Sequence, residues 1–299
     1  MKKIGVLILT VVCCMWINPE ISIALSNDPP DLLITEISPQ GKTYEYIEIY
    51  NNTDVPIDLH DYNLRYLSMN KSMQVWDIKE STIIEPKSTK IIWIKNAASK
   101  DDLDFEDFKR HFHASVDRTQ LIRLEGNLNN SSKNTVVLAT DTGAVISYVS
   151  YDKGLIHYKQ DKGAKKLKRD KQIKGNTPGQ VSNEQVPLNA NKQTDTTKPI
   201  VRPVTMPKEV PERSDVSIEI QIEDEHLIKR AEIFYKRGQD SAFTQTNMLM
   251  KTTTSYQSII SRYDVYGSVP TFEYYIEISD GQHVIRYPEK GTKMIKIGN

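Results

Sequence analysis

The most regularly patterned stretch of the chain is EYIEIYNNTDVPIDLHDYNLRYL, with acidic side chains at Glu45, Glu48, Asp54, Asp58 and Asp61. Two carboxylates across a bond can cleave a glycoside, and several converging carboxylates can hold metal ions for hydrolysis. Glu45 and Glu48 differ in parity, however, so on a β-strand they point to opposite faces. We therefore predict that these acids are solvated strand and turn residues and that they form no catalytic pair.

A second group of acids lies between residues 101 and 107. An EF-hand calcium loop needs glycine at its sharp turn, where this run has Asp107, so acids at a helix N-terminus are the favoured interpretation. His111 and His113 are two residues apart, whereas zinc binding on a helix prefers a spacing of four. The remaining histidines stand alone in the sequence, which favours surface or hydrogen-bonded roles: His60, His157, His226 and His283.

Sequence motifs for nucleophilic or cofactor chemistry are missing. There is no G-x-S-x-G motif and no P-loop. The combination of Asp-x-His, Gly-Asp-x-x-Asp and Gly-Asn-His boxes that holds two metals in metallophosphoesterases is also missing. We therefore predict no catalytic, cofactor-binding or metal-binding residues, and no cofactor.

One local charge pattern suggests binding. The segment KQDKGAKKLKRDKQIK, residues 159–174, has eight basic and two acidic residues. A basic loop at a sandwich edge can neutralise the phosphates of a nucleic acid or a wall polymer by counterion release. The candidate polyanion-binding residues are Lys165, Lys166, Lys168, Arg169 and Lys171. The alternative is an exposed loop that only keeps the protein soluble.

The N-terminus has the pattern of a secretory signal peptide. Two lysines precede an apolar run over residues 4–16, and small-x-small cleavage sites end at Ala24 and Ser26. That run is too short to span a bilayer, which needs about 20 residues, and no similar run follows. We predict that residues 1–26 are a signal peptide and that the mature protein is secreted, either extracellular or associated with the cell wall, without a transmembrane segment.

Composition limits the remaining possibilities. Basic and acidic residues balance at 39 each, so no global charge indicates a nucleic-acid or membrane partner. Both cysteines, Cys13 and Cys14, lie in the predicted signal peptide. A mature chain without disulfides must be held together by its hydrophobic core, which is easier above about 100 residues.

The elements that position these side chains are mainly β-strands. Short alternating runs rich in β-branched and aromatic residues recur between turn-forming Asn, Asp, Gly and Pro. In the first half these runs are LLITEI, YEYIEIY, STKIIWI, TVVLAT and AVISYVSY. Only residues 101–116 have the apolar spacing of a helix. The polar segment 183–199 lacks aromatics and periodicity, which is typical of a flexible linker.

Beyond residue 199 the alternation resumes in VSIEIQIED, RAEIFYKR, YQSIISRY, TFEYYIEISD and HVIRYP. Strands at such intervals are typical of a sandwich. The sequence thus predicts an all-β protein of two β-sandwich domains, at 27–182 and 200–299, joined by the linker.

Five segments of the first half follow one another in a distinctive order: LLITEI (32–37), YEYIEIYNNTDVPIDLHDYNLR (44–65), STIIEPKSTKIIWI (81–94), NTVVLATDTGAVISYVSY (134–151) and GNTPGQV (175–181). This order resembles the lamin tail domain, in its secreted bacterial form. The resemblance covers residues 31–182 and implies an immunoglobulin-like sandwich. The insertion at 96–116 is longer and more acidic than that sandwich needs.

The second half is similar to the immunoglobulin or fibronectin type III-like modules that follow lamin tail domains in bacterial surface proteins. The matching runs are RAEIFYKRGQDSAFTQTNM, YQSIISR and FEYYIEISDGQ. Some such relatives continue into a metallophosphoesterase or nuclease. The resemblance therefore implies a non-catalytic binding protein with an unidentified protein or cell-surface partner. Two alternatives remain: a polyanion binder, and the accessory part of a truncated or split secreted enzyme.

Overall fold

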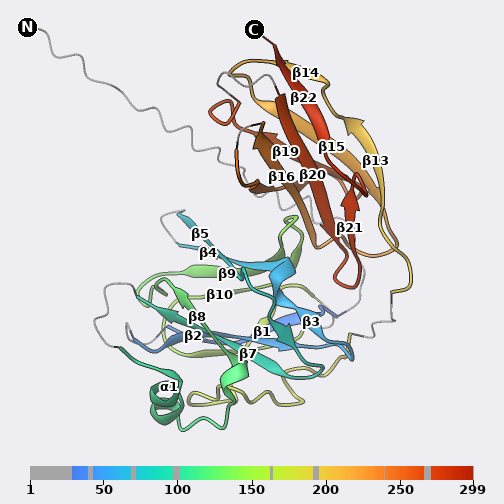
Figure 1. The fold of residues 1–299 in the computed structure, drawn as a ribbon. Coiled ribbons are helices and arrows are strands. Elements are labelled where there is room, and N and C mark those ends of the chain that lie inside the picture. Colours follow the sequence, from blue (N-terminus) through green and yellow to red (C-terminus); the bar gives the residue numbers. More distant parts are fainter. Residues whose placement is uncertain are drawn as a thin grey trace, which may run out of the picture.

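The computed structural model describes residues 29–39, 43–68, 72–96, 102–161, 164–190, 195–238, 240–265 and 271–298. The predicted signal peptide lies outside these residues. The described chain forms two β-sandwiches, one from each half of the sequence (Figure 1). The predicted all-β class is confirmed. Among the described residues, no helix is both long and apolar enough to cross a membrane.

The first sandwich has a six-stranded and a four-stranded sheet. The larger sheet has the order β12 (Lys168–Asp170), β11 (Ile156–Lys159), β1 (Leu32–Ser38), β2 (Glu45–Asn51), β7 (Thr89–Lys95) and β8 (Leu121–Glu125). The smaller sheet has the order β10 (Val145–Tyr151), β9 (Asn134–Thr140), β4 (Tyr62–Leu67) and β5 (Met73–Asp77). A two-stranded ladder joins β3 (Ile57–Asp58) to β6 (Ile83–Ile84), and two 3₁₀ turns are η2 (Leu59–Asp61) and η3 (Arg118–Gln120). Only β7 and β8 pair in parallel within these sheets.

The core of this sandwich follows the alternation of β2. Ile47 and Ile49 are fully buried between the sheets with Leu64 and Leu138. On the other side of β2, Tyr46 belongs to a separate buried cluster. Every residue of β1 and β2 is buried, because both faces of the larger sheet are covered. This sheet therefore has no solvated face at its centre.

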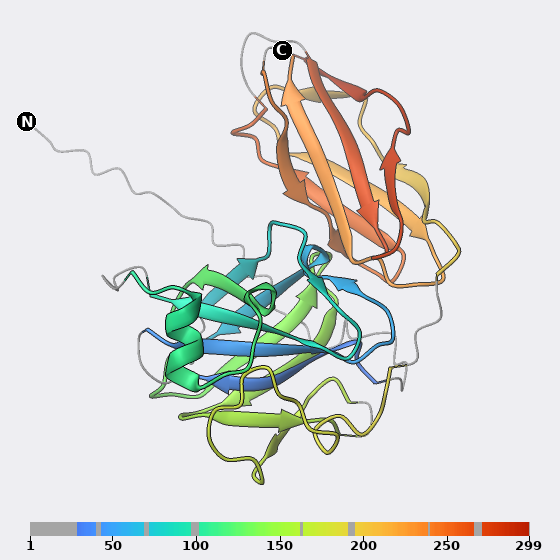
Figure 2. The same ribbon diagram turned by 60° about the horizontal axis from the view of Figure 1, so that its bottom comes forward.

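A single helix among the described residues covers part of that outer face (Figure 2). Helix α1 (Phe105–Phe112) begins after Asp104, whose side chain accepts hydrogen bonds from the backbone of Glu106 and Asp107. The Asp107 side chain accepts one from Asp104 N, which completes a capping box. Phe108 is fully buried against Tyr46 and Trp93. The short helix with an acidic N-terminus is confirmed.

The second sandwich also has two sheets. One has the order β13 (Ile200–Thr205), β15 (Val216–Glu223), β19 (Ser255–Ile260) and β18 (Leu249–Met250). The other has the order β14 (Glu209–Pro211), β22 (Lys293–Gly298), β20 (Thr271–Ser279), β16 (Arg230–Arg237) and β17 (Thr244–Asn247), with β21 (Val284–Tyr287) also paired to β20. In β15 the isoleucines at 218, 220 and 222 are buried while alternate residues are not. The period of two therefore specifies this domain directly.

Part of the predicted linker is packed. Gln185 is buried, its backbone carbonyl accepts from Gln160 N at 2.8 Å, and its side chain donates to Tyr158 O at 3.1 Å. Asn52 donates to Leu188 O at 2.9 Å. Residues 183–190 therefore lie on the first sandwich, unlike the flexible chain expected over 183–199. Hydrogen bonds of polar side chains hold this segment on the sandwich. The spacing of apolar residues in the sequence does not predict such bonds. The boundaries of the two domains stay a prediction.

The two sandwiches meet through a buried polar junction, a point that the sequence left open. Asp61 in the first accepts from Arg230 Nε at 2.9 Å and from Ser279 Oγ at 2.7 Å in the second. Thr142, in the turn between β9 and β10, donates through its backbone to Lys229 O at 3.1 Å and accepts from Met250 N at 2.9 Å. These bonds fix the turn against the second domain (Figure 1).

Candidate functional site

The acids of β2 are buried, so the prediction of solvated residues is wrong for them. Glu45 is 3% exposed, and one of its oxygens accepts from Leu128 N at 2.7 Å. Burial raises the pKa of Glu45 to about 7. Glu48 is 0% exposed. The physical reason is that the larger sheet is covered on both faces, so neither parity of β2 reaches water.

Glu48 and Glu36 form a buried carboxyl pair on neighbouring strands. Glu48 accepts from Thr35 Oγ1 at 2.7 Å and from Gly179 N at 2.6 Å. Burial, and then the charge of Glu36, raise the pKa of Glu48 to about 8. Burial thus disfavours the ionised form of Glu48, and its bond to Gly179 ties that residue to the sheet.

Glu36 is held just as firmly. Its carboxyl accepts from the Tyr46 hydroxyl and from the backbone and hydroxyl of Thr177. His157 Nδ1 lies 3.6 Å from Glu36 Oε2, and both side chains are almost completely buried. Burial raises the pKa of Glu36, while His157 and the hydrogen bonds oppose that rise. Two neighbouring carboxyls with raised pKa values, such as Glu36 and Glu48, can act as an acid–base pair. Here the groups that hydrogen-bond to them are residues that hold the sandwich together.

The remaining acids of this stretch have structural roles or none. Asp58 caps η2 by accepting from His60 N at 3.0 Å, and it also accepts from Thr82 N at 2.7 Å. Asp61 belongs to the domain junction, and Asp54 is exposed. That these acids form no catalytic pair stays a prediction.

The basic segment forms an ordered edge of the larger sheet. Strand β12 pairs with β11, and Lys165 O and Leu167 N bond to the backbone of Tyr148 in the other sheet. The segment therefore closes the sandwich between its two sheets. Residues 162–163 lie outside the described residues.

The five candidate cations do not share one environment. Lys165 is half-buried, and burial lowers its pKa. Lys168 pairs with Asp161 at 2.8 Å. Exposed side chains occupy four of the positions: Lys166, Lys168, Arg169 and Lys171. These four define the basic edge.

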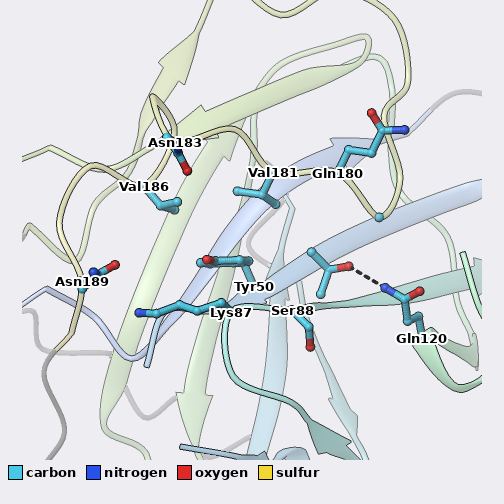
Figure 3. A pocket seen from close by; sticks show the side chains of 11 residues that line it. Tyr50, Lys87, Ser88, Gln120, Gln180, Val181, Asn183, Val186 and Asn189 are labelled. Carbon is cyan, nitrogen blue, oxygen red and sulfur yellow. Dashed lines mark hydrogen bonds between the residues drawn. The ribbon is translucent and has the colours of Figure 1, made fainter. Parts of the chain in front are cut away.

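An open cleft of about 670 Å³ lies on the first sandwich, beside the end of β2 (Figure 3). Tyr50 forms its floor, and amide side chains of Gln180, Asn183 and Asn189 surround it. Lys87, the cation of the lining, donates to Asn52 O at 2.7 Å. The described lining contains no carboxylate and no histidine. Such a surface can hydrogen-bond a polar ligand.

His111 and His113 are not arranged to share a ligand. The His111 ring stacks on Tyr44, with centroids 3.8 Å apart. His113 ends helix α1 in the left-handed conformation, with φ of 52°. Their lack of a joint role stays a prediction.

His226 and His283, in contrast, come together although sequence analysis treated them as isolated. Both lie near the buried Asp195. The nearest sequence signal is Asp224-Glu225-His226, an Asp-x-His triplet. Asp58-Leu59-His60 has the same form without such a cluster among the described residues, so the triplet alone does not identify a site.

Known proteins resemble this chain in sequence. An uncharacterized protein, YvnB of Bacillus subtilis, is 28% identical over 291 residues, which cover 90% of this chain and 22% of that protein. The chain thus spans about a fifth of the length of this relative. Among solved structures, red sea bream transglutaminase aligns with 90% of this chain and 31% of its own, at 7% identity and a TM-score of 0.20.

The lamin tail domain family model matches residues 26–153. This match covers the strands from β1 to β10. It ends before the GNTPGQV run, which contributes Thr177 and Gly179 to the buried acids. Residues 26–153 of this chain therefore match the lamin tail domain.

Proposed function

We propose that this chain is a non-catalytic, secreted binding protein that acts at or outside the cell surface. The cleft of Figure 3 carries the proposal, because its described lining can form hydrogen bonds but contains no carboxylate, histidine or cysteine. The lamin tail domain match and the structural use of the β2 acids support it. The apolar run at residues 4–16 supports secretion.

A hydrolysis assay tests the non-catalytic role. The chain is expected to turn over no phosphoester, nucleic acid or glycan, with or without added Mg²⁺, Mn²⁺ or Zn²⁺. Glu48→Gln serves as the control, because it removes a fully buried acid while keeping its shape. Turnover by the parent that Glu48→Gln abolishes, in a variant that still folds, would contradict the proposal.

A second candidate function is polyanion binding at the basic edge. The observation that favours it is the exposure of four cations on and beside the ordered strand β12. Cations on an ordered strand lose less conformational entropy on binding than cations on a flexible loop. Nucleic acid and phosphate-containing wall polymer share the chemistry that this edge would recognise.

Polyanion binding has a characteristic salt dependence. Affinity for duplex DNA should fall with salt at a log–log slope of about −0.9 per phosphate, or roughly −3 to −4 for the four cations. Changing Lys166, Lys168, Arg169 and Lys171 to Gln should remove that slope. The matched control changes four exposed lysines elsewhere to Gln: Lys79, Lys133, Lys153 and Lys208. Equal losses in the two variants, or no binding at low salt, would refute the basic edge as the site.

The third candidate is an accessory part of a longer secreted enzyme, such as a metallophosphoesterase or nuclease. The observation behind it is that this chain covers 22% of the relative from Bacillus subtilis. An adjacent reading frame that encodes a catalytic domain would favour this candidate over a free-standing binding protein.

A further inference from the structure

Three separate segments of the chain bring metal-ligand side chains together at one end of the second sandwich. Asp224 and His226 directly follow β15, and Asp280 and His283 lie in the turn between β20 and β21. Asp195 precedes β13 and completes two sets of three ligands. Within each set, one ligand atom per residue lies within 4.8 Å of the others.

The two sets share Asp195. It groups with Asp280 and His283 on one side and with Asp224 and His226 on the other. Asp195 Oδ2 is 2.9 Å from His226 Nδ1, and His283 Nδ1 is hydrogen-bonded to Asp280 Oδ2 at 3.0 Å. The two sets of ligands therefore adjoin at Asp195.

The three carboxylates are removed from water. Their side chains are 3% exposed for Asp195, 2% for Asp224 and 0% for Asp280. Buried carboxylates this close to one another are costly unless a positive charge compensates them. The histidines are more exposed, at 36% for His226 and 21% for His283, which leaves a route for an ion to enter.

Two buried atoms of the cluster have unused bonding capacity. Asp224 Oδ2 has no hydrogen-bond partner among the described residues. His226 Nδ1 is also without one, although it lies only 2.9 Å from Asp195 Oδ2. A carboxylate oxygen and an imidazole nitrogen that approach without hydrogen bonding are the arrangement expected of two ligands directed at a common ion. Buried polar atoms otherwise almost always have a partner.

Neighbouring groups hold the ligands in place. Asp195 Oδ1 accepts from the backbone and hydroxyl of Thr197 at 2.9 and 3.0 Å, which leaves Oδ2 for the cluster. Asp280 Oδ1 accepts from Gln282 N and His283 N. Such supporting bonds orient the ligands of metal sites.

We propose that Asp195, Asp224, His226, Asp280 and His283 form a binding site for one divalent transition-metal ion, with Zn²⁺ as the best fit. Imidazole nitrogen favours Zn²⁺ over Mg²⁺ and Ca²⁺, which prefer oxygen ligands. Asp195 belongs to the connecting segment and the other four to the second sandwich. The bound ion links the connecting segment at Asp195 to the second sandwich, next to Ser279 of the domain junction.

The test uses the full chain, produced without an affinity tag, and Zn²⁺ alone as the probe. Calorimetry and native mass spectrometry should show one ion per chain, and the melting temperature should rise with Zn²⁺. The double variant His226→Gln with His283→Gln should bind Zn²⁺ at least about tenfold more weakly. Even changes to residues that only support the ligands lower the metal affinity of a site by about 10–100-fold. Asp224→Asn should weaken Zn²⁺ binding too.

The matched control is His111→Gln with His113→Asn, which removes two exposed histidines from the other domain. Asn suits the left-handed backbone of position 113. This control should bind Zn²⁺ as the parent does, and circular dichroism should show that all variants fold. No binding by the parent would mean that the histidines alone neutralise the carboxylates and would overturn the proposal. Unchanged binding in the His226/His283 variant, or Ca²⁺ binding that survives that variant, would overturn it as well.

Discussion

Replacing Arg230 with Met is expected to lower the free energy of unfolding by about 3–5 kcal/mol, the cost of removing one partner of a buried ion pair. The guanidinium contacts Asp61 at 2.9 Å and Glu232 at 2.5 Å, and the three side chains are 5–8% exposed. Without Arg230, two buried carboxylates lose their cation. Urea denaturation measures the change.

Tryptophan fluorescence makes this experiment specific to the junction. In a chain that lacks residues 1–26, both tryptophans, Trp76 and Trp93, lie in the first sandwich, whereas position 230 lies in the second. A shift of the fluorescence transition in Arg230→Met would therefore report coupling between the domains. Combining it with Asp61→Asn should give a total smaller than the sum of the single effects, because the two residues interact.

The control is Arg202→Met. Arg202 also pairs with a carboxylate, Glu223, at 2.6 Å, but these side chains are 60% and 50% exposed. A surface pair of this kind contributes at most about 1 kcal/mol. If Arg230→Met were as mild as Arg202→Met, or additive with Asp61→Asn, the domains would not be joined by this junction.

The second large effect is a loss of stability as pH rises from about 5 to 8. Burial raises the pKa of Glu48 to about 8 from its ordinary value of 4.5. Between these values the folded state holds a proton that the unfolded state has lost. The stabilisation from Glu48 is thus fully present below pH 4.5 and is lost as pH rises through 8, at up to about 1.4 kcal/mol per pH unit.

Other buried acids act in the same direction. Burial raises the pKa of Glu45 and of Asp141 to about 7. Glu48→Gln mimics the protonated acid. Between pH 5 and 8 the unfolding free energy of the first sandwich should therefore fall by about 3–4 kcal/mol less in this variant than in the parent. Glu125→Gln, at an exposed position of β8, should leave the pH dependence of the parent unchanged. An identical pH profile for Glu48→Gln and the parent would contradict a neutral, buried Glu48.

Local patterns were sufficient to predict much of the fold. The alternation in residues 45–51 and 216–223 predicted β2 and β15, because each side chain's face depends only on its own parity. The acids before Phe105 predicted the start of α1, since a helix N-terminus is stabilised by nearby side chains. Information of this kind lies within a few residues of the element.

The burial of the acids could not be predicted in that way. Glu48 is separated by 131 positions from Gly179, whose N–H it binds, and parity does not reveal that both faces of a sheet are covered. The same limit hid the second-domain cluster, because Asp195, His226 and His283 meet only after β15 and β20 have packed. Lone histidines in a sequence are therefore weak evidence against a shared site.

The central claim is that the acids of β2 are buried groups that build the fold, and the charge state of Glu48 tests that burial most directly. Carbon-13 NMR of the Glu48 carboxyl, assigned by its absence in Glu48→Gln, measures that state across a pH titration. We expect a midpoint at about 8, as burial beside Glu36 requires. A midpoint near the ordinary 4.5 would mean an ionised, accessible carboxylate and would contradict the account.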